Sequence, residues 1–415
     1  MPGSRQIDIC QNCGSGALEP LLFLGHLPPV NALPDSEGLG GALQSFPLNL
    51  VRCGKCGLVQ IGYIVAPDVL FPESYPYRSG VTASLRRNFE DLARDVAAVM
   101  PLSRETVIVD IGSNDGTLLN SFKDSGACLV GIEPSDAARD AIAAGIPTVQ
   151  DYFRAEAAAK AVAIHGPPSL VTATNMFAHA DDVHGIVADI KAMLAPGALV
   201  VIENHYLVDL VETLQYDTIY HEHMRYYSVK SMMDVMARHG FTCFDAKPIP
   251  THGGSIRCFF TLSEEAAPSD RLRGMLAREK ALGFDDGSAL VAFAGRVVRH
   301  RRALQTLLNG IADAGHSVFG IGAPSRASTL VSYACPHADL IAAVCELPGS
   351  PKIGHYLPGT QIPIIDETRL YEEQPDYALV LSWHIADEII ANIRKRGFRG
   401  KVIIPLPDPV VVDTD

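Results

Sequence analysis

Two pairs of cysteines near the N-terminus constrain the first part of this chain more than any other feature of the sequence. They read Cys10-Gln11-Asn12-Cys13 and Cys53-Gly54-Lys55-Cys56, and a glycine follows each pair. The C-x-x-C spacing lets two thiolates bind one face of a tetrahedral Zn²⁺, with the glycine allowing the backbone to turn under the sulfurs. Four unrelated thiols are the alternative interpretation. The doubled spacing favours a structural zinc. Its predicted ligands are Cys10, Cys13, Cys53 and Cys56.

Length and composition set the class of protein. A chain of 415 residues predicts two or three domains, and 47% hydrophobic with 20% charged residues is typical of a globular protein. A formal net charge of −13 argues against a nucleic-acid partner. The sequence has no apolar run long enough to cross a bilayer and no signal-peptide core at its N-terminus. We expect a cytoplasmic protein without a membrane partner, acting on a small molecule as a monomer or weak homo-oligomer.

Short apolar strands alternate with helical patterns in two separate parts of the chain. The first alternation runs from about residue 107 to 202, after a helical pattern that Pro101 ends. The second follows a long helix predicted over residues 286–309. Such alternation predicts parallel sheets with helices on both faces, so the fold class is α/β. We therefore predict three domains, at residues 1–75, 76–285 and 286–415.

A glycine-containing loop follows the first predicted strand, at residues 109–117. Gly112 allows a tight turn, and Gly116 would let a ligand approach the backbone at a helix N-terminus. The glycines are spaced G-x-x-x-G, so the loop is neither a Walker loop nor the dinucleotide motif. Glu133 ends the second strand with a carboxylate suited to ribose hydroxyls. The loop and this acid are similar to the S-adenosylmethionine site of class I methyltransferases; an empty Rossmann-like turn is the alternative. The candidate cofactor residues here are Asp110, Gly112, Ser113, Asn114, Gly116 and Glu133.

Five further motifs suggest one family. They are N-M-F-A-H at 175–179, Y-H-E-H at 220–223, T-H-G-G-S-I-R at 251–257, G-I-G-A-P at 320–324 and L-P-G-T at 357–360. With the cysteine pairs, they make the chain resemble, over nearly its whole length, the three-domain C-methyltransferases of deoxysugar biosynthesis, such as the nucleotide-deoxysugar C-3-methyltransferases. The resemblance implies an N-terminal zinc-binding domain, a class I methyltransferase domain and a C-terminal Rossmann-like domain. It also implies S-adenosylmethionine as cofactor and a nucleotide-linked 4-keto-6-deoxyhexose as substrate.

Methylation of a carbon next to a ketone needs a base that removes a weakly acidic proton. A base with a pKa near the working pH is favoured, which points to histidine. The Y-H-E-H motif offers His223 as the base, Glu222 to orient or charge-balance it, and Tyr220 as a donor to oxygen; the resemblance assigns the base in the same way. Neighbouring residues face opposite ways in a strand, so this motif has to lie in a turn or a helix end. His221 and His223 as metal ligands, or a solvated polar turn, are the alternatives.

Other candidate residues depend more on the resemblance. His179 follows a predicted strand at the ligand-binding edge of the sheet and would contact the reacting sugar, unless it caps a helix or packs in the core. Tyr75 and Tyr77 match a tyrosine-bearing segment of the family. Asp151 and Tyr152 follow the predicted third strand, where this class holds adenine; the alternative is an apolar helix start. Asn175 completes the set of predicted cofactor residues.

The predicted substrate residues lie in two glycine-containing segments. His252 and Arg257 flank a turn that would close on the sugar, or that only joins two strands. Residues 322–329 could bind a diphosphate through backbone N–H groups and Arg326, with Lys352 as a partner, unless Lys352 lies in a solvated loop. Many relatives carry Gly-Asn where this chain has Ala327-Ser328, which leaves the nucleotide open.

Three other functions stay open on the sequence alone. The acceptor could be a non-sugar ketone or acid, or an oxygen or nitrogen atom. The chain could also be a relative that binds ligands without catalysis, although the retained polar motifs disfavour this. A dehydrogenase using the C-terminal unit is disfavoured because Gly320-x-Gly322 lacks the third glycine at its proper place.

Overall fold

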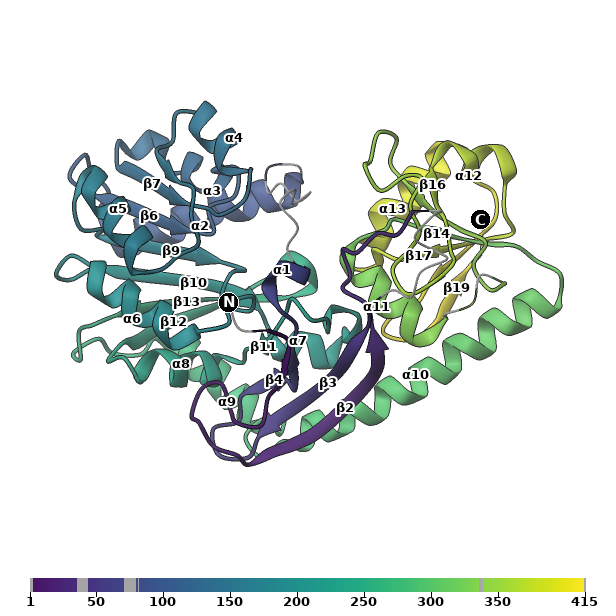
Figure 1. The fold of residues 1–415 in the computed structure, drawn as a ribbon, viewed down its shortest axis with the longest axis horizontal. Coiled ribbons are helices and arrows are strands. Elements are labelled where there is room, and N and C mark those ends of the chain that lie inside the picture. The colour runs from purple at the N-terminus through teal and green to yellow at the C-terminus, as the bar shows by residue number, and fades with distance from the viewer. Residues whose placement is uncertain are drawn as a thin grey trace.

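The structure, a computed structural model, describes residues 3–35, 44–70, 80, 82–335, 337 and 339–413. Figure 1 shows two α/β lobes side by side, with a curved N-terminal sheet below and between them. The middle part of the chain forms one lobe and the C-terminal part forms the other. The three-part α/β architecture predicted from the sequence is confirmed.

The N-terminal sheet has four strands in the order β11-β4-β3-β2. They are β2 (Leu18–Leu27), β3 (Phe46–Cys53), β4 (Val59–Ile61) and β11 (Arg225–Tyr226). Buried and half-buried residues alternate in the first half of β3, whereas the last four residues, 50–53, are all buried. The edge strand β11 comes from the middle part of the chain and pairs antiparallel with β4, with Arg225 opposite Gln60. Next to this sheet lie a small pair of strands, β1 (Arg5–Gln6) and β5 (Tyr63–Ile64), and the short helix α1 (Pro67–Leu70).

The middle unit is built on a seven-stranded sheet in the order β12-β13-β10-β9-β6-β7-β8. Its strands are β6 (Val107–Ile111), β7 (Cys128–Ile132), β8 (Thr148–Val149), β9 (Leu170–Thr174), β10 (Leu199–His205), β12 (Thr242–Ile249) and β13 (Ser255–Thr261). The five strands from β10 to β8 are parallel, and β12 and β13 complete the sheet antiparallel. The carboxyl ends of the parallel strands therefore share one edge, where ligands bind in such sheets.

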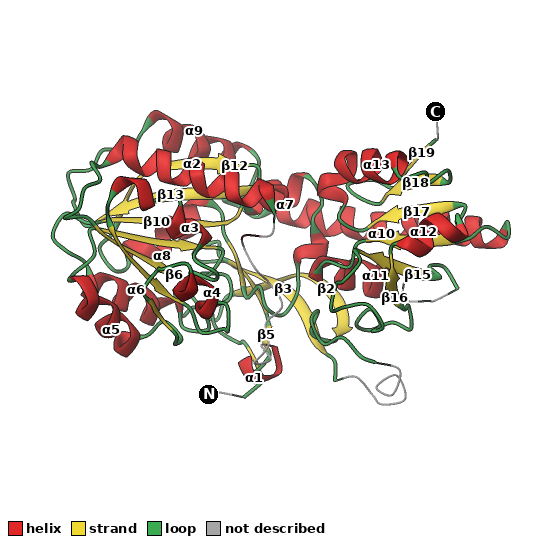
Figure 2. Ribbon diagram, turned by 90° about the horizontal axis from the view of Figure 1, so that it is seen from above, coloured by secondary structure: helices red, strands yellow, loops and turns green. Residues whose placement is uncertain are grey.

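Helices cover both faces of this sheet, as Figure 2 shows. The helices of this unit are α2 (Ala83–Val99), α3 (Thr117–Asn120), α4 (Ala138–Ala143), α5 (Ala155–His165), α6 (Val183–Met193), α7 (Leu207–Glu212), α8 (Val229–Ala237) and α9 (Asp270–Ala281). Because side chains alternate along a strand, Ile108 packs in the cluster with α2 while Val109 packs in the cluster with α5 and α6. Short 3₁₀ turns lie at η3 (Lys123–Ser125), η4 (Tyr216–Thr218) and η5 (Thr251–Gly253).

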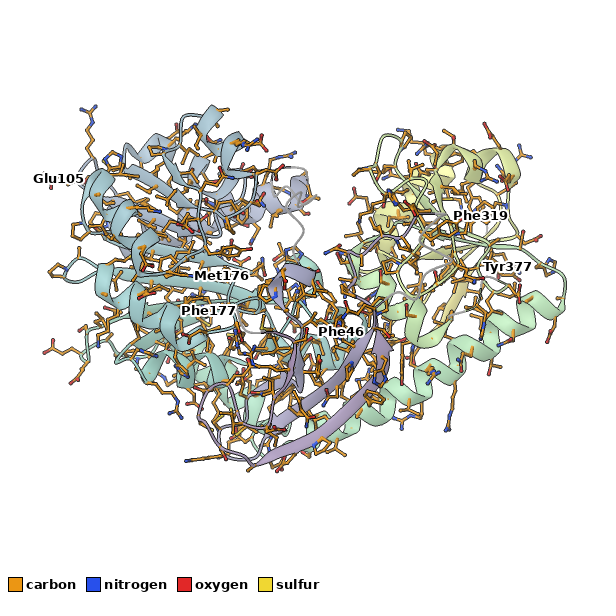
Figure 3. The ribbon with its side chains drawn as sticks, viewed as in Figure 1. Phe46, Glu105, Met176, Phe177, Phe319 and Tyr377 are labelled. Atoms are coloured by element: carbon orange, nitrogen blue, oxygen red, sulfur yellow. The ribbon has the colours of Figure 1, made fainter. Side chains whose placement is uncertain are left out.

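The C-terminal unit has a six-stranded sheet in the order β16-β15-β14-β17-β18-β19, parallel except for β19. Its strands are β14 (Val318–Ile321), β15 (Ala343–Glu346), β16 (Ile364–Asp366), β17 (Tyr377–Val380), β18 (Lys401–Ile404) and β19 (Val410–Val412). Its helices are α11 (Ser325–Ala334), α12 (Thr368–Glu373) and α13 (Ala386–Lys395), with the 3₁₀ turn η6 (Trp383–Ile385). Phe319 of β14 and Tyr377 of β17 are labelled in Figure 3.

The long helix α10 (Ser288–Asp313) runs along the C-terminal lobe and reaches β2 of the N-terminal sheet. It agrees with the helix predicted over residues 286–309. The predicted division at residue 285 falls between α9 and α10, and the division at 75 lies outside the described residues, so both boundaries stay predictions. Within the described ranges, no helix is long and apolar enough to span a membrane.

Candidate functional site

The four paired cysteines meet at one point of the N-terminal module. All four Sγ atoms lie within 4.8 Å of one another, with 3.5 Å between Cys10 and Cys56 and between Cys13 and Cys53. A tetrahedral zinc with Zn–S bonds of about 2.3 Å separates its sulfurs by roughly 3.8 Å, so the cluster fits the ion. With four sulfur ligands no position stays open for substrate, which is the pattern of a structural site.

The backbone repeats the same turn at both cysteine pairs. Gly14 N–H donates to the Cys10 carbonyl over 2.9 Å, and Gly57 N–H donates to the Cys53 carbonyl over 2.8 Å. Both glycines have a positive φ, 69° and 76°. A side chain would be strained at either position, which explains why glycine follows each pair.

The loop after β6 is held against the end of β7. Gly112, with φ 74°, donates its N–H to the Ile132 carbonyl over 2.8 Å. Glu133 directly follows Ile132. Its carboxylate accepts from Asn114 N–H at 3.0 Å and from Ser135 N–H at 2.9 Å. The buried acid is thus fixed at the carboxyl edge of the sheet.

Two buried polar atoms beside this loop have no partner among the described residues. They are Ser113 Oγ and Asn175 Oδ1, the latter at the end of β9. Met176, labelled in Figure 3, lies 3.4 Å from where a Cβ on Gly112 would be. Because buried polar groups normally have hydrogen-bond partners, these atoms fit the polar groups of a bound cofactor.

The other predicted cofactor residues lie differently from expectation. Asp110 is buried beneath the loop and accepts from Thr172 Oγ1 over 2.7 Å, and burial raises its pKa to about 7. A Cβ on Gly116 would meet Ile146 and Ala141, so this glycine permits close helix packing rather than ligand approach. Asp151 forms an ion pair with Lys160 over 3.0 Å, and Tyr152 is 43% exposed.

The Y-H-E-H motif lies in a turn, as its predicted chemistry requires. His223 N–H donates to the Tyr220 carbonyl over 2.9 Å, and the imidazole Nδ1 lies 2.9 Å from the Thr218 carbonyl oxygen. A carbonyl only accepts, so Nδ1 carries the proton and Nε2 keeps its lone pair. Burial, and next the nearby His179, hold the pKa of His223 well below its usual range. The ring is therefore neutral and able to accept a proton at Nε2.

Aromatic and imidazole rings surround His223. The ring centroids of Tyr220, His179 and His205 lie 4.0, 4.9 and 5.2 Å from that of His223. His252 follows at 5.4 Å from His205. Burial lowers the pKa of His179 and His252 to about 4 in both cases. The cluster is thus a group of uncharged polar rings that come from the loop after β9, the end of β10, η5 and the Y-H-E-H turn.

Glu222 does not hold His223 in the way predicted. Its Oε1 accepts from Asn31 Nδ2 over 2.7 Å, and the Asn31 Oδ1 accepts from Ser325 Oγ over 3.0 Å. Asn31 comes from the N-terminal module and Ser325 from α11, so three parts of the chain meet at this carboxylate. Burial raises the pKa of Glu222 to about 7. The imidazole is oriented instead by the Thr218 carbonyl.

Three predicted substrate residues make internal contacts. Arg257 is fully buried and forms ion pairs with Glu203, over 2.9 Å, and with Asp95. Arg326 is bound bidentately by Asp217. The third is Lys352, whose Nζ donates to the Ala323 carbonyl over 2.6 Å.

These contacts change the interpretation of the three residues. The arginines are committed to buried carboxylates, whose loss would leave an unpaired buried charge. Lys352 does lie beside the loop after β14, because it donates to the Ala323 carbonyl of that loop. Tyr75 and Tyr77 lie outside the described residues.

Sequence reasoning missed Asn31, His205 and Asp217. The strand ending in His205 was predicted to stop at residue 202, where its apolar run ends. Asn31 follows Pro28, Pro29 and Val30 in a segment without periodicity, so the sequence carries no signal for its contact with Glu222. His221, a possible metal ligand on the sequence, lies 3.3 Å from the Pro47 carbonyl through Nε2.

Comparisons with known proteins agree with this arrangement. Family models match residues 10–71 (zinc binding domain), 84–245 (methyltransferase domain) and 250–407 (C-methyltransferase C-terminal domain). The chain is 32% identical to the C-methyltransferase NovU of Streptomyces niveus, covering 99% of this chain and 98% of that protein.

Solved structures match less than half of the chain, at low similarity. The glycopeptide N-methyltransferase MtfA, complexed with S-adenosylmethionine, is 13% identical with a TM-score of 0.33, covering 42% of this chain and 87% of that one. Magnesium protoporphyrin IX methyltransferase from Synechocystis is 10% identical with a TM-score of 0.33, covering 43% of this chain and 79% of that one.

Proposed function

This chain belongs to the C-methyltransferase family, and we propose that the carbon it methylates lies next to the ketone of a nucleotide-linked keto-deoxysugar. It is an S-adenosylmethionine-dependent enzyme with a structural zinc. The sulfonium of the cofactor supplies an electrophilic methyl group. The acceptor and the roles of individual residues are the proposal.

We assign the cofactor to the loop after β6. Glu133 binds the ribose hydroxyls, while Ser113 Oγ and Asn175 Oδ1 offer buried polar atoms to the rest of the molecule. Asn114 N–H is already bonded to Glu133, so it fixes the acid rather than the ligand. Asp110 lies beneath the loop, where burial raises its pKa to about 7 and so disfavours its charged form.

His223 is the proposed base. Its Nε2 would take the proton alpha to the ketone, leaving an enolate whose carbon would bond to the methyl group as the S–CH₃ bond of the cofactor breaks and a neutral thioether leaves. Glu222 precedes the base in the same turn, but its carboxylate accepts from Asn31, so we assign it to holding this turn against the N-terminal module. Tyr220 and His179 border the base and are the proposed neighbours of the oxyanion. Tyr77 and Tyr75 enter only through the family resemblance.

A second loop of the same design supports a nucleotide-bearing substrate, and this observation carries the proposal. In the C-terminal unit, Gly322 (φ 81°) donates its N–H to the Cys345 carbonyl over 2.8 Å, and Glu346 follows directly. Glu346 Oε2 accepts from Ala323 N–H over 3.0 Å, as Glu133 does from Asn114. Both loops lie at the centre of a parallel sheet with an acid ending the next strand, which is where nucleotides bind in such folds. His252 packs against His205 in the ring cluster, and we keep it as a proposed contact of the sugar.

The acceptor is tested by product analysis. Incubation with ¹³C-methyl S-adenosylmethionine and a nucleotide-linked 4-keto-6-deoxyhexose is expected to give a methyl group bonded to carbon, identified by carbon-13 NMR. The same sugar without its nucleotide should react poorly, because it cannot use the loop after β14. Methyl transfer to oxygen or nitrogen, or equal rates on a non-sugar ketone, would contradict the proposal.

The cofactor assignment predicts a difference between two matched acids. Glu133→Ala is expected to weaken S-adenosylmethionine binding by about 1–3 kcal/mol, the scale of hydrogen bonds to a charged group. Glu346→Ala, at the equivalent position of the C-terminal unit, should leave that affinity unchanged. Calorimetry with the cofactor alone measures both. Equal affinity in the Glu133 variant and the parent would rule out this site.

A further inference from the structure

The carboxylate of Asp217 is held entirely by the C-terminal unit among its described contacts. Arg326 Nε and Nη2 donate to its two oxygens over 2.8 and 3.0 Å, and Trp383 Nε1 donates over 2.7 Å. The guanidinium lies over the Trp383 ring at 5.1 Å. Asp217 is fully buried, and a buried carboxylate is stable only when it is paired and hydrogen-bonded.

Arg326 and its helix hold the whole η4 turn, not Asp217 alone. Arg326 Nη2 also donates to Gln215 Oε1 over 3.0 Å, and Nη1 lies 3.0 Å from His384 Nδ1. One turn further along α11, Thr329 Oγ1 donates to the Ile219 carbonyl over 3.2 Å. Residues 215–219 are thus fixed from the C-terminal lobe at three points.

The η4 turn ends at the residue that orients the proposed base. Thr218 directly follows Asp217, and its carbonyl is the hydrogen-bond acceptor of His223 Nδ1. A shift of this carbonyl would free the imidazole to rotate or to change tautomer, which would remove the lone pair from Nε2.

We propose that Asp217 is a positioning residue for His223: clamped by Arg326 and Trp383, it fixes η4 so that the Thr218 carbonyl holds the imidazole as the Nδ1–H tautomer. The C-terminal lobe thereby aligns the base as well as binding substrate. This inference rests on the proposed role of His223. In this proposal Arg326 acts by holding the Asp217 carboxylate, in place of the predicted contact with a diphosphate.

Asp217→Asn is the direct test, because it keeps the shape of the side chain but cannot accept from both guanidinium nitrogens. We expect ¹⁵N NMR of histidine-labelled protein to show the Nδ1–H tautomer of His223 in the parent and its loss in the variant, with His223→Asn identifying the signal. Methyl transfer to the keto-sugar should show a kcat lower by about 10²-fold, the scale of a misplaced catalytic group. The affinity for S-adenosylmethionine should not change.

A matched control separates positioning from stability. Asp95→Asn weakens another arginine–carboxylate pair, in which Asp95 of α2 binds the buried Arg257. It should lower the melting temperature without changing the tautomer or kcat. If Asp217→Asn does not fold, Arg326→Lys decides in the same way, because lysine keeps the charge without the two-pronged geometry.

Each result bears on one of the two claims. An unchanged tautomer and kcat in a folded Asp217 or Arg326 variant overturns the positioning role, as does an equal loss of kcat in the Asp95 control. Failure of the proposed function looks different, since His223→Asn would then retain full activity whatever the Asp217 variant does.

Discussion

Replacing His223 with asparagine is expected to remove nearly all turnover while leaving S-adenosylmethionine affinity unchanged. Asparagine can still donate to the Thr218 carbonyl, so the turn is preserved, but nothing remains in the place of Nε2. A positioned base is worth about 10²–10⁴ in rate, and kcat should fall by that factor. Exchange of the alpha proton with deuterated solvent, measured without methyl donor, isolates the step.

The pH dependence of the parent follows from the same histidine. Burial disfavours the charged ring, so its pKa lies well below 6.5 and the base is neutral at neutral pH. Activity should therefore be lost only as the pH falls through that lowered pKa, and the acid limb should disappear with the residue. His316→Gln, on the surface of the C-terminal unit, is the matched control. If the alpha proton of the substrate exchanges with solvent as fast in the His223 variant as in the parent, another group is the base.

Loss of zinc is expected to have the largest effect on the fold. Cys53→Ala removes one of four ligands, and structural zinc sites contribute apparent binding energies of about 10–16 kcal/mol in small zinc domains. We expect less than one zinc per chain by elemental analysis and an early thermal transition for the N-terminal sheet. Methyl transfer should be lost as well, because Asn31 and β4 contact the segment that carries Glu222 and His223.

The control for this variant is Cys128→Ser. Cys128 is the first residue of β7 and is not part of the four-cysteine cluster. It should keep its zinc and its activity. Cofactor binding should survive in both variants, since the loop after β6 makes its contacts within the middle unit. A Cys53 variant that melts and turns over like the parent would show that the cluster is not needed as a zinc site.

Local patterns predicted most of the fold and part of the site. Strands 107–111 and 128–132 are short apolar runs, and the glycines at 112 and 322 mark turns that need positive φ. The four-cysteine cluster could be predicted because each C-x-x-C pair is a local pattern in the sequence.

Contacts between distant residues could not be predicted in the same way. Arg257 and Arg326 look like ligand-binding groups until the structure shows Glu203 and Asp217 beside them. Asn31 lies 191 positions from Glu222, and no periodic pattern links the two. Burial of polar groups depends on which elements meet, and that is a property of tertiary packing.

The pairing of β11 with β4 has a consequence for how the protein is made. During synthesis the N-terminal strands leave the ribosome first, but their sheet lacks its last strand until residues 225–226 follow. The free edge of β4 is thus open to other chains while residues 62–224 are being added. Completion of this sheet and formation of the turn before β11 become a single event. Nascent chains cut before residue 225 are therefore expected to aggregate more than chains that continue past it, because only the longer chains can pair the edge of β4 with β11.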